Sequence, residues 1–499
     1  MTLVAGIDAG TQSIKLVVYD AARKQVVATT SAPLELISGD DGSREQLASW
    51  WIDGVRSCFA QLDAGTRAAI AAVSVSGQQH GFVPLDRDGN VLAPAKLWCD
   101  TSSARECDEI MDAVGGAQRC IELAGNPILA GYTASKLPWT RKHRPEAYAA
   151  LATILLPHDY LNFFLTGERF TEVGDASGTG WLDVRTRQWS KELLHAIDPQ
   201  RDLSACLPPL VELGTTFAIL PAVADDLGLP HDVRVAVGGG DNMMAAIGTG
   251  CVVPGRLSMS LGTSGTLFAY SDTPVIDVGG AWAAFCSSSG GWLPLICTMN
   301  CTVATEAIAG LFNLDIAGGA GEAILAATAP GAGGLVLLPF FNGERTPNLP
   351  DSRAALMGMD LINNTPQNLY RAAMEGATYT LKHGFDAFAA AGMQFDSIVL
   401  TGGGGKSAAW RQMVADVFDL PVEVPLQTEG AAFGAALQAL WSLRHEQGDA
   451  VELPTLVLQH VATDPSLSAR PDPTRAAAYR RHYARFLQHL DAVRPLYAA

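Results

Sequence analysis

The chain has 499 residues, of which 48% are hydrophobic and 17% are charged, so it is too long for one ordinary domain and too poor in charge to be disordered. Its formal net charge of −17 and the absence of a Lys/Arg cluster argue against a nucleic-acid partner. An acidic chain of this kind binds phosphates locally, through backbone N–H groups, helix N-termini and a divalent cation.

The first residues, MTLVAGIDAG, lack the basic and apolar regions of a signal peptide, and no apolar run in the sequence reaches membrane-spanning length. The nine cysteines are scattered, and Cys297 and Cys301 lack the second pair that a zinc site needs. We therefore expect reduced thiols, a cytoplasmic location and no membrane partner.

The chain opens with a predicted β-hairpin. An apolar run at residues 3–8 ends in an acid, the turn sequence AGTQS follows, and residues 14–19 form a second β-rich run. A third run spans residues 26–32, and residues 44–62 have helical spacing with Leu47, Trp50, Trp51, Val55 and Phe59 on one face. The opening segment is therefore predicted as β-β-β-α.

The same hairpin pattern recurs in the second half of the chain. Residues 257–261 lead into GTSG, and residues 266–270 leave it. Gly10 and Gly262 are 252 positions apart (262 minus 10), about half the chain. The simplest account is two similar α/β domains, residues 1–250 and residues 251–499.

Each half also contains an apolar strand that runs into a glycine turn. Residues 233–237 lead into GGGDN, and residues 397–400 lead into TGGGG. Both segments are typical of α/β units, in which the turn is followed by a helix. Residues 473–496 have helical spacing and predict a closing helix.

Ligands of open α/β sheets bind beyond the carboxyl ends of the strands, so acids at those ends are the first catalytic candidates. Asp8 precedes a Gly-Thr turn and is suited to positioning Mg²⁺, directly or through water. Its competing interpretation is a turn aspartate that caps its own backbone, although the repeated hairpin favours phosphate binding. Asp241 follows three glycines, where a helix N-cap is the competing interpretation.

Two glycine-rich turns could hold phosphates or a nucleotide. The turn at Gly262, Thr263 and Ser264 offers N–H groups and two hydroxyls to an anion, or is an ordinary hairpin. The run GGGGKS is not a Walker A motif, because that pattern requires glycine where this chain has Leu400. Its glycines still let adenine and ribose lie against bare backbone.

A third polar segment, GQQHG, lies between predicted strands at residues 71–75 and 82–85. Three polar side chains flanked by glycines suit the recognition of a polyhydroxyl ligand, although His80 taken alone could be a hydrogen-bonded structural histidine. Trp98 and Asp100 are weaker candidates for the same site, because tryptophan commonly lies in a core and aspartate commonly forms turns.

Together these motifs resemble the FGGY carbohydrate kinases, members of the sugar kinase, Hsp70 and actin superfamily, over nearly the whole chain. IDAGTQSIK is similar to the first phosphate hairpin of the family, GGGDN to its catalytic-base segment, SLGTSG to its second phosphate hairpin and LTGGGGKSAAWRQ to its adenosine segment. Two further stretches, GYTASKLPW and ALMGMDLINNTPQNLYRAAMEG, resemble its signature patterns, and all six occur in the family's order.

The resemblance implies an α/β fold with two ribonuclease-H-like (actin-like ATPase) domains flanking a central cleft. Residues 1–250 would bind the sugar, and residues 251–499 would bind the nucleotide and end in the C-terminal helix. ATP and Mg²⁺ are the implied cofactors. Family members commonly form homodimers, which makes a homodimer the expected assembly.

The resemblance also assigns roles to individual residues. Asp241 would be the general base and Asp8 would position Mg²⁺ through water, making these the two catalytic aspartates. The expected sugar contacts are Gln79, His80, Asp241 and Asn242. The expected phosphate and nucleotide contacts are Thr11, Gln12, Gly262, Thr263, Ser264, Gly402, Gly403, Gly404 and Ser407.

The segments GQQHG, WCDTSS, LLPHDYLNFFLTGE, DASGTGWLDV and NGERTP are similar to those of family members that phosphorylate D-xylulose. The implied reaction is transfer of the γ-phosphate of ATP to O5 of D-xylulose. Many bacterial members carry methionine where this chain has Gln79, so L-xylulose, ribulose and glycerol stay open as substrates. A non-catalytic actin-like or Hsp70-like nucleotide-binding module is a further alternative, against which the GGGDN and GQQHG segments argue.

Overall fold

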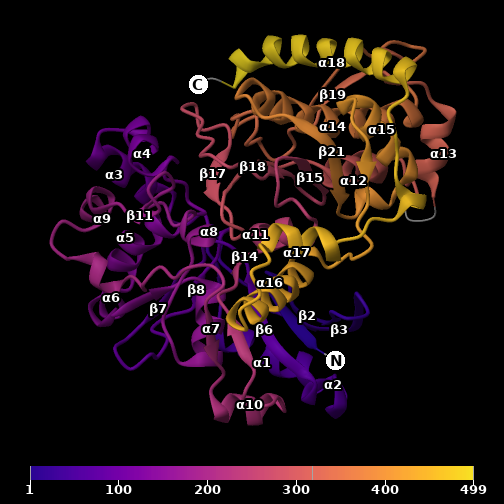
Figure 1. Cartoon of the computed structure of the whole chain (residues 1–499). Coiled ribbons are helices and arrows are strands. Elements are labelled where there is room, and N and C mark those ends of the chain that lie inside the picture. Colours follow the sequence, from indigo (N-terminus) through magenta and orange to yellow (C-terminus); the bar gives the residue numbers. More distant parts are fainter. Residues whose placement is uncertain (1, 317–318, 498–499) are drawn as a thin grey trace. The chain divides into compact units, whose positions relative to one another are not determined.

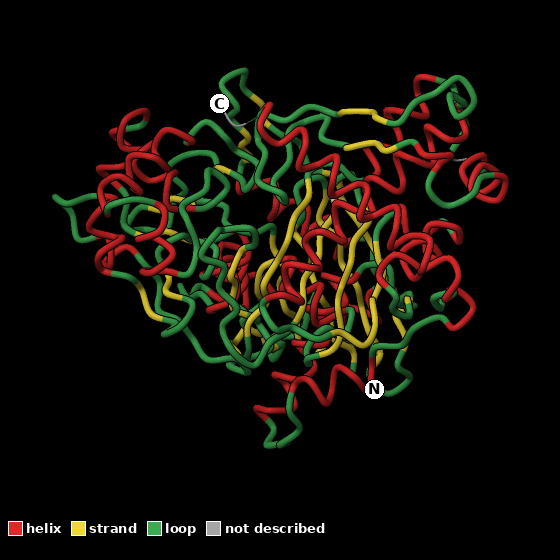
Figure 2. Tube along the Cα trace, turned by 90° about the horizontal axis from the view of Figure 1, so that it is seen from above, coloured by secondary structure: helices red, strands yellow, loops and turns green. Residues whose placement is uncertain are grey.

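The computed structural model describes residues 2–316 and 319–497 (Figure 1). Its contacts divide the chain into two compact units, and each unit is assembled from three separate segments. Unit 1 contains Met1–Val252, Ser271–Leu293 and Glu429–Val461, and unit 2 contains Val253–Tyr270, Pro294–Thr428 and Ala462–Ala499. Figure 2 distinguishes the strands (yellow) from the helices (red) of both units.

Unit 1 is built on a mixed β-sheet with the strand order β12-β13-β6-β1-β2-β3, and β14 also pairs with β6. Strands β1, β6, β13 and β14 are parallel where they pair, whereas β2, β3 and β12 run antiparallel to their neighbours. The strands are β1 (Leu3–Ala9), β2 (Ser13–Asp20), β3 (Gln25–Pro33), β6 (Ile70–Gly77), β12 (Thr216–Ala218), β13 (Arg234–Ala236) and β14 (Gly239–Gly240). The hairpin and the third strand predicted at the start of the chain are confirmed.

The predicted helix over residues 44–62 is only partly right. Arg44–Gln46 forms strand β5, and helix α1 spans Ala48–Ala60. The first residues prefer the strand because Glu45 is buried and its carboxylate meets the Arg144 guanidinium at 2.8 Å. Within α1 the buried stripe is Trp51, Val55 and Phe59, whose spacing of four places them on the sheet side of the helix.

Helix α16 (Gly430–Glu446) belongs to unit 1 although it comes late in the sequence. It packs on β1 and β6, and its approach is so close that a Cβ atom on Gly6 of β1 would lie 1.9 Å from the Ala432 carbonyl oxygen. It also packs on α11 (Asp241–Gly248), where a Cβ on Gly434 would lie 1.8 Å from the carbonyl oxygen of Met244. Glycine is therefore required at these helix contacts.

The remaining elements of unit 1 are short helices and small sheets. The helices are α2 (Ala64–Ala68), α3 (Ala104–Val114), α4 (Ala117–Ala124), α5 (Thr133–His143), α6 (Pro145–Ala150), α7 (Pro157–Thr166), α8 (Val173–Ala176), α9 (Lys191–Ile197), the 3-10 turn η1 (Leu203–Cys206), α10 (Pro221–Leu227) and α17 (Leu453–His460). The strands are β4 (Ile37–Ser38), β7 (Val83–Leu85), β8 (Ala95–Lys96), β9 (Thr153–Leu155), β10 (Leu182–Asp183), β11 (Gln188–Trp189) and β17 (Ala283–Cys286).

Unit 2 repeats the central motif of unit 1. Its main sheet has the order β18-β16-β15-β21-β22, in which β15 and β16 form the second predicted hairpin and β15 runs parallel to β21. The strands are β15 (Gly255–Leu261), β16 (Gly265–Ala269), β18 (Trp292–Thr298), β19 (Val336–Leu338), β20 (Ala355–Met357), β21 (Phe395–Thr401) and β22 (Val422–Glu423). The helices and 3-10 turns are α12 (Thr302–Leu311), α13 (Ala320–Ala327), η2 (Ala332–Gly334), α14 (Pro366–Ala390), η3 (Gly404–Lys406), α15 (Ala408–Phe418), η4 (Pro465–Leu467), α18 (Pro473–Val493) and η5 (Arg494–Leu496).

The closing helix predicted at residues 473–496 is found as α18 followed by the 3-10 turn η5. Among the described residues, all nine cysteines are free thiols. Over the same part of the chain, none of the helices combines the length and the apolar character that crossing a bilayer requires.

Candidate active site

Asp8 lies next to the tip of the first hairpin. It pairs with Lys15 of β2 and Ser76 of β6, and the Ser76 hydroxyl donates a 2.8 Å hydrogen bond to its Oδ1. Burial raises the pKa of Asp8 to about 6, against the lowering effects of Ser76 and Lys15. The ammonium of Lys15 is in turn held 2.5 Å from the Glu429 carboxylate. A divalent cation would therefore stabilise the ionised form of Asp8.

The hairpin tip places the predicted phosphate contacts Thr11 and Gln12 just after Asp8. The Thr11 hydroxyl donates to Gln78 Oε1 at 2.9 Å and accepts from the Trp98 indole at 3.0 Å. Gln12 is exposed. Trp98, a weaker sequence candidate, therefore supports the hairpin and leaves 42% of its surface exposed.

Asp100, the other weaker candidate, has a structural environment. It is fully buried, and its Oδ2 accepts from the Lys96 ammonium at 2.8 Å and from the Arg44 backbone N–H at 2.8 Å. Its Oδ1 accepts from the Ser102 hydroxyl at 2.6 Å. Both oxygens are thus engaged by protein groups, which assigns Asp100 to folding.

Asp241 is the first residue of α11 and follows β14 directly. The cap residue is Gly240, so the N-cap interpretation of Asp241 is wrong by one position. Oδ1 of Asp241 accepts from the backbone N–H of Asn242 at 2.7 Å and from its side-chain Nδ2 at 3.0 Å. Both bonds end on one oxygen, which leaves Oδ2 as the natural acceptor for a ligand proton.

The pKa of Asp241 is raised to about 8, first by burial and then by the negative charges of Asp8 and Asp175. The two predicted catalytic aspartates, Asp8 and Asp241, therefore lie close enough to repel each other. A carboxyl group with this pKa is matched to proton transfer near neutral pH, as a general base requires.

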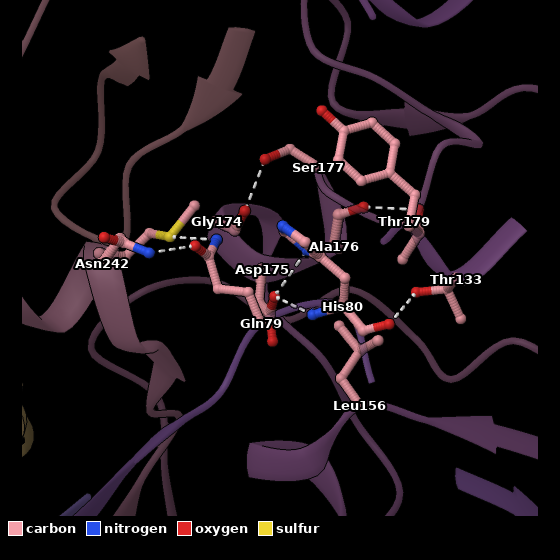
Figure 3. Close-up of polar contacts among 12 residues, drawn as sticks. Gln79, His80, Thr133, Leu156, Gly174, Asp175, Ala176, Ser177, Thr179 and Asn242 are labelled. Atoms are coloured by element: carbon pink, nitrogen blue, oxygen red, sulfur yellow. Dashed lines mark hydrogen bonds and ion pairs between the residues drawn. The ribbon is translucent and has the colours of Figure 1, made fainter. Parts of the chain in front are cut away.

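Gln79 and Asn242 form one hydrogen-bonded chain that ends on Asp241. Gln79 Oε1 accepts from Asn242 Nδ2 at 2.6 Å, and Gln79 Nε2 lies 3.0 Å from the Met243 sulfur (Figure 3). Only 5% of Gln79 is exposed. The Gln79 amide therefore fixes the orientation of Asn242.

His80 has a left-handed backbone conformation, with φ of 62°. This conformation is strained for a residue with a side chain, and it is held by hydrogen bonds on both sides of the residue. The His80 N–H donates to Asp175 Oδ1 at 3.2 Å, and the His80 carbonyl accepts from the Thr133 hydroxyl at 3.0 Å (Figure 3). The same carbonyl also accepts from the Lys136 ammonium at 3.3 Å.

The ring of His80 packs against Tyr132 and Phe285, with centroid separations of 5.2 Å for each pair. Lys136, from the signature-like segment GYTASKLPW, supports the same loop from behind. Its ammonium donates to the carbonyls of Gly131 at 2.6 Å and Tyr132 at 2.9 Å, besides that of His80. Burial lowers the pKa of Lys136 to about 7.

Sequence reasoning assigned no role to three buried charged residues behind this loop, which are Glu172, His158 and Asp175. Asp175 lies in the short helix α8, and its backbone N–H donates to Oε1 of the cap residue Glu172 at 2.7 Å. The only sequence signal for His158 and Asp175 was their place in the segments LLPHDYL and DASGTG, which resembled the family without indicating a function, and Glu172 lay outside these segments.

In unit 2 the second hairpin turn is fixed from outside by backbone hydrogen bonds. The N–H of Thr302 donates to the Gly262 carbonyl at 2.9 Å, and the N–H of Cys301 donates to the Thr263 carbonyl at 3.0 Å. Thr263 is exposed and Ser264 is partly exposed. The predicted phosphate-binding hydroxyls are therefore carried on a rigid turn.

The glycine run after β21 lies beside this turn. A Cβ on Gly402, whose φ is 85°, would lie 2.7 Å from the Leu261 carbonyl oxygen, whereas a Cβ on Gly403 would meet nothing within 4 Å. Gly404 is buried against Trp410. The Ser407 hydroxyl accepts from the Trp410 N–H at 3.0 Å and so caps α15. The structure thus brings the two predicted nucleotide segments of unit 2 together.

The protein side chains alone offer few ligands for a metal ion. Within the described ranges, no group of three or more His, Cys, Asp or Glu side chains could hold a metal ion. Asp8 and its neighbour Asp241 offer carboxylates but no complete cage. This suits Mg²⁺, which is commonly bound by one or two carboxylates together with substrate phosphates.

Comparisons with known proteins agree with this arrangement. Residues 3–248 match the N-terminal domain of the FGGY family of carbohydrate kinases, and residues 257–443 match its C-terminal domain. This chain belongs to the FGGY family of carbohydrate kinases, so it has the mixed α/β, two-domain fold of the actin-like ATPase class and uses ATP as phosphate donor.

Several individual proteins are similar to this chain over most of its length. The xylulose kinase of Haemophilus influenzae is 42% identical over 497 residues, which cover 97% of this chain and 99% of the relative. The xylulose kinase of Streptomyces coelicolor is 41% identical over 90% of both chains. The crystal structure of a xyloylose kinase from Brucella ovis aligns with a TM-score of 0.91 at 30% identity, covering 99% of this chain and all of that one.

Proposed function

We propose that this protein transfers the γ-phosphate of ATP to O5 of D-xylulose, giving D-xylulose 5-phosphate, with Asp241 as general base. The observation that carries the proposal is the state of the Asp241 carboxylate. One oxygen is fixed by Asn242, the other points to no protein donor among the described residues, and the pKa of the group is raised to about 8. D-xylulose is favoured because the curated relatives at about 40% identity are xylulose kinases.

The sugar would lie beside the loop that carries His80, with hydroxyls on the His80 ring and the Asn242 amide. Oδ2 of Asp241 would accept the proton of the primary hydroxyl while O5 forms a bond to the γ-phosphorus and the bond from that phosphorus to the β-γ bridging oxygen breaks. ADP leaves, and the base returns its proton to water.

Unit 2 would hold the nucleotide. The turn from Gly262 to Ser264 supplies N–H groups and hydroxyls for phosphate oxygens, and Gly402, Gly403 and Gly404 offer bare backbone to adenosine. Ser407 would contribute least, because its hydroxyl caps α15. In unit 1, Thr11 and Gln12 would face phosphates. Mg²⁺ held by Asp8 through water would neutralise negative charge on the phosphates.

The Gln79 side chain was expected to contact the sugar directly, but its contacts favour another role. Its amide is already engaged by Asn242 and Met243. We therefore propose that it orients a sugar-binding residue and shapes specificity indirectly.

A substrate panel tests the function. ADP formation from Mg-ATP would be measured with D-xylulose, L-xylulose, ribulose and glycerol, with a His80→Ala variant beside the wild type. Strong stimulation by D-xylulose, and a raised sugar KM in His80→Ala, are expected. Stimulation by a different sugar would keep the kinase chemistry and reject D-xylulose. If no compound stimulates ADP formation, the kinase function is rejected and the alternative of a non-catalytic nucleotide-binding module is favoured. The expected homodimer is tested separately by sedimentation.

A further inference from the structure

A row of buried charged groups lies directly behind the His80 loop. His158 is fully buried, and its Nε2 lies 2.9 Å from Asp159 Oδ1 while its Nδ1 lies 3.0 Å from Asp175 Oδ2. Asp159 and Asp175 are themselves 1% and 0% exposed. The row therefore runs from Asp159 through His158 to Asp175 without reaching solvent.

The contacts define the protonation of His158. His158 Nδ1 makes a hydrogen bond with Asp175 Oδ2, whereas Nε2 and Asp159 Oδ1 face each other as an ion pair at 2.9 Å without hydrogen-bond geometry. A carboxylate beside each ring nitrogen favours the doubly protonated, positively charged ring. Burial acts to lower the pKa of His158, but Asp159 and Asp175 outweigh it and raise the pKa well above its ordinary value. Burial acts to raise the pKa of Asp175, and the two histidines beside it lower it overall. Asp175 is thus kept ionised by a fixed positive charge.

The Asp175 carboxylate in turn contacts His80. The same Oδ1 that accepts the His80 backbone N–H at 3.2 Å lies 3.4 Å from His80 Nδ1, so both the backbone and the ring of His80 meet one carboxylate oxygen (Figure 3). The position of the Asp175 carboxylate is fixed, because its Oδ2 is hydrogen-bonded to His158 and the backbone N–H of Asp175 donates to Glu172.

The surroundings leave the His80 ring little choice of position. A Cβ atom on Gly178 would lie 1.8 Å from His80 Cε1, so that position must be glycine for the ring to fit. A Cβ on Gly240 would lie 3.2 Å from the Asp175 Cγ, which puts the same carboxylate against the residue preceding Asp241. Asp175 therefore lies at the junction of the two segments that carry His80 and Asp241.

We propose that Asp175 and His158 are positioning residues for the sugar site: the His158 imidazolium keeps Asp175 in place, and Asp175 fixes His80 as the tautomer that carries its proton on Nδ1. Any hydrogen bond from the His80 ring to the sugar is then made by Nε2. The link to the sugar rests on the proposed function, whereas the tautomer of His80 does not depend on it.

The first test is made on the ligand-free wild type. Histidine ring ¹⁵N NMR, with the His80 signals assigned by their loss in His80→Gln, reports which nitrogen is protonated. We expect a protonated Nδ1 in the wild type and a change of that state in Asp175→Asn. A wild-type His80 protonated on Nε2 alone would overturn the proposal.

The second test uses steady-state kinetics with D-xylulose and Mg-ATP. His158→Gln and Asp175→Asn should raise the sugar KM by about 10- to 100-fold, the effect of losing a well-placed charged or polar contact, with the KM for ATP changed less than about twofold. The double variant should resemble either single variant, because His158 acts through Asp175. An unchanged sugar KM in folded His158→Gln, or additive effects, would overturn the proposal.

His460→Gln is the matched control. His460 is also buried, at 8% exposure, and its Nδ1 lies 2.8 Å from the Tyr19 hydroxyl, but it has no contact with this row. It should lose stability without a change in sugar KM. If His158→Gln does not fold, the wild-type spectrum and Asp175→Asn decide the question. A wild type without sugar-stimulated ADP formation would reject the proposed function alone, because the NMR result is independent of turnover.

Discussion

Replacing Asp241 by asparagine should lower activity and raise stability at the same time. The exchange keeps the size of the side chain and one carbonyl oxygen, so the 2.7 Å hydrogen bond from the Asn242 N–H can be retained. It removes the oxygen that would accept the sugar proton. Loss of a general base commonly slows turnover by about 10²- to 10⁴-fold, which corresponds to about 3–5 kcal/mol of barrier.

The pH dependence follows from the raised pKa. With a pKa of about 8, only about one wild-type molecule in ten has Asp241 ionised at about pH 7 in the ligand-free state. Since the base must be ionised, kcat/KM for the sugar should rise with pH, reach half of its plateau at about pH 8 and level off above it, with the whole profile shifted to lower pH if bound Mg²⁺ stabilises the carboxylate.

Stability should change in the opposite sense. Unfolding restores the ordinary pKa of 3.8 to Asp241, whereas the folded state holds it near 8. The folded protein is therefore favoured below about pH 4 and loses this advantage as pH rises to about 8, with a slope of at most about 1.4 kcal/mol per pH unit. Asp241→Asn lacks this loss, so its melting temperature should exceed that of the wild type by a margin that grows across the same range.

The assay pairs coupled ADP detection with thermal unfolding at several pH values. Asp108→Asn, at an exposed position of α3, is the control and should change neither quantity. A variant that keeps more than about one tenth of wild-type kcat would refute the role of Asp241 as base. A variant that is less stable than the wild type near pH 8 would refute the burial argument for its pKa.

Three further changes test other parts of the site. Asp8→Asn should raise the Mg²⁺ concentration needed for half-maximal rate, measured by Mg²⁺ titration, whereas Asp100→Asn should lower stability and leave that concentration unchanged. Gln79→Met removes the acceptor for Asn242 Nδ2, so kcat/KM for the sugar should fall by about 3- to 10-fold; an unchanged value would show that Gln79 does not orient Asn242. Gly434→Ala drives a Cβ against the Met244 carbonyl and should destabilise the fold by about 1–3 kcal/mol or more, measured by chemical denaturation, while Gly310→Ala at an open, exposed position of α12 should be neutral or stabilising.

Much of the fold could be predicted from local patterns. Both hairpins, the strands before GGGDN and TGGGG, and the closing helix depend on alternation, glycine turns and helical spacing, which are visible in a short window of sequence. The start of α1 could not be predicted in this way. Arg44–Gln46 fits a helical period, but Glu45 is paired with Arg144 from a distant segment, and that contact favours a strand.

The residues of the candidate site also differ in how far local sequence could predict them. Asp8 near the end of β1, Asp241 directly after β14 and the glycine turns could be proposed as candidates from local sequence, because each lies at or near a strand end. His158 and Asp175 were not, because their function depends on groups brought together from separate helices, and a buried ion pair has no sequence period. Gln79 was identified, but its partner Asn242 lies 163 positions away, so only the structure shows that its amide is already engaged.

The late position of α16 in the sequence has a consequence for synthesis of the protein. Strands β1 and β6 are synthesised early, because they lie in the first 77 residues of the chain. The helix that packs on them, α16, begins at Gly430 and is therefore synthesised after most of unit 2. A nascent chain that ends at Val252 lacks this cover and exposes apolar strand surface, which favours aggregation. Unit 1 can therefore finish folding only near the end of translation, and chaperones have reason to hold the growing chain until then.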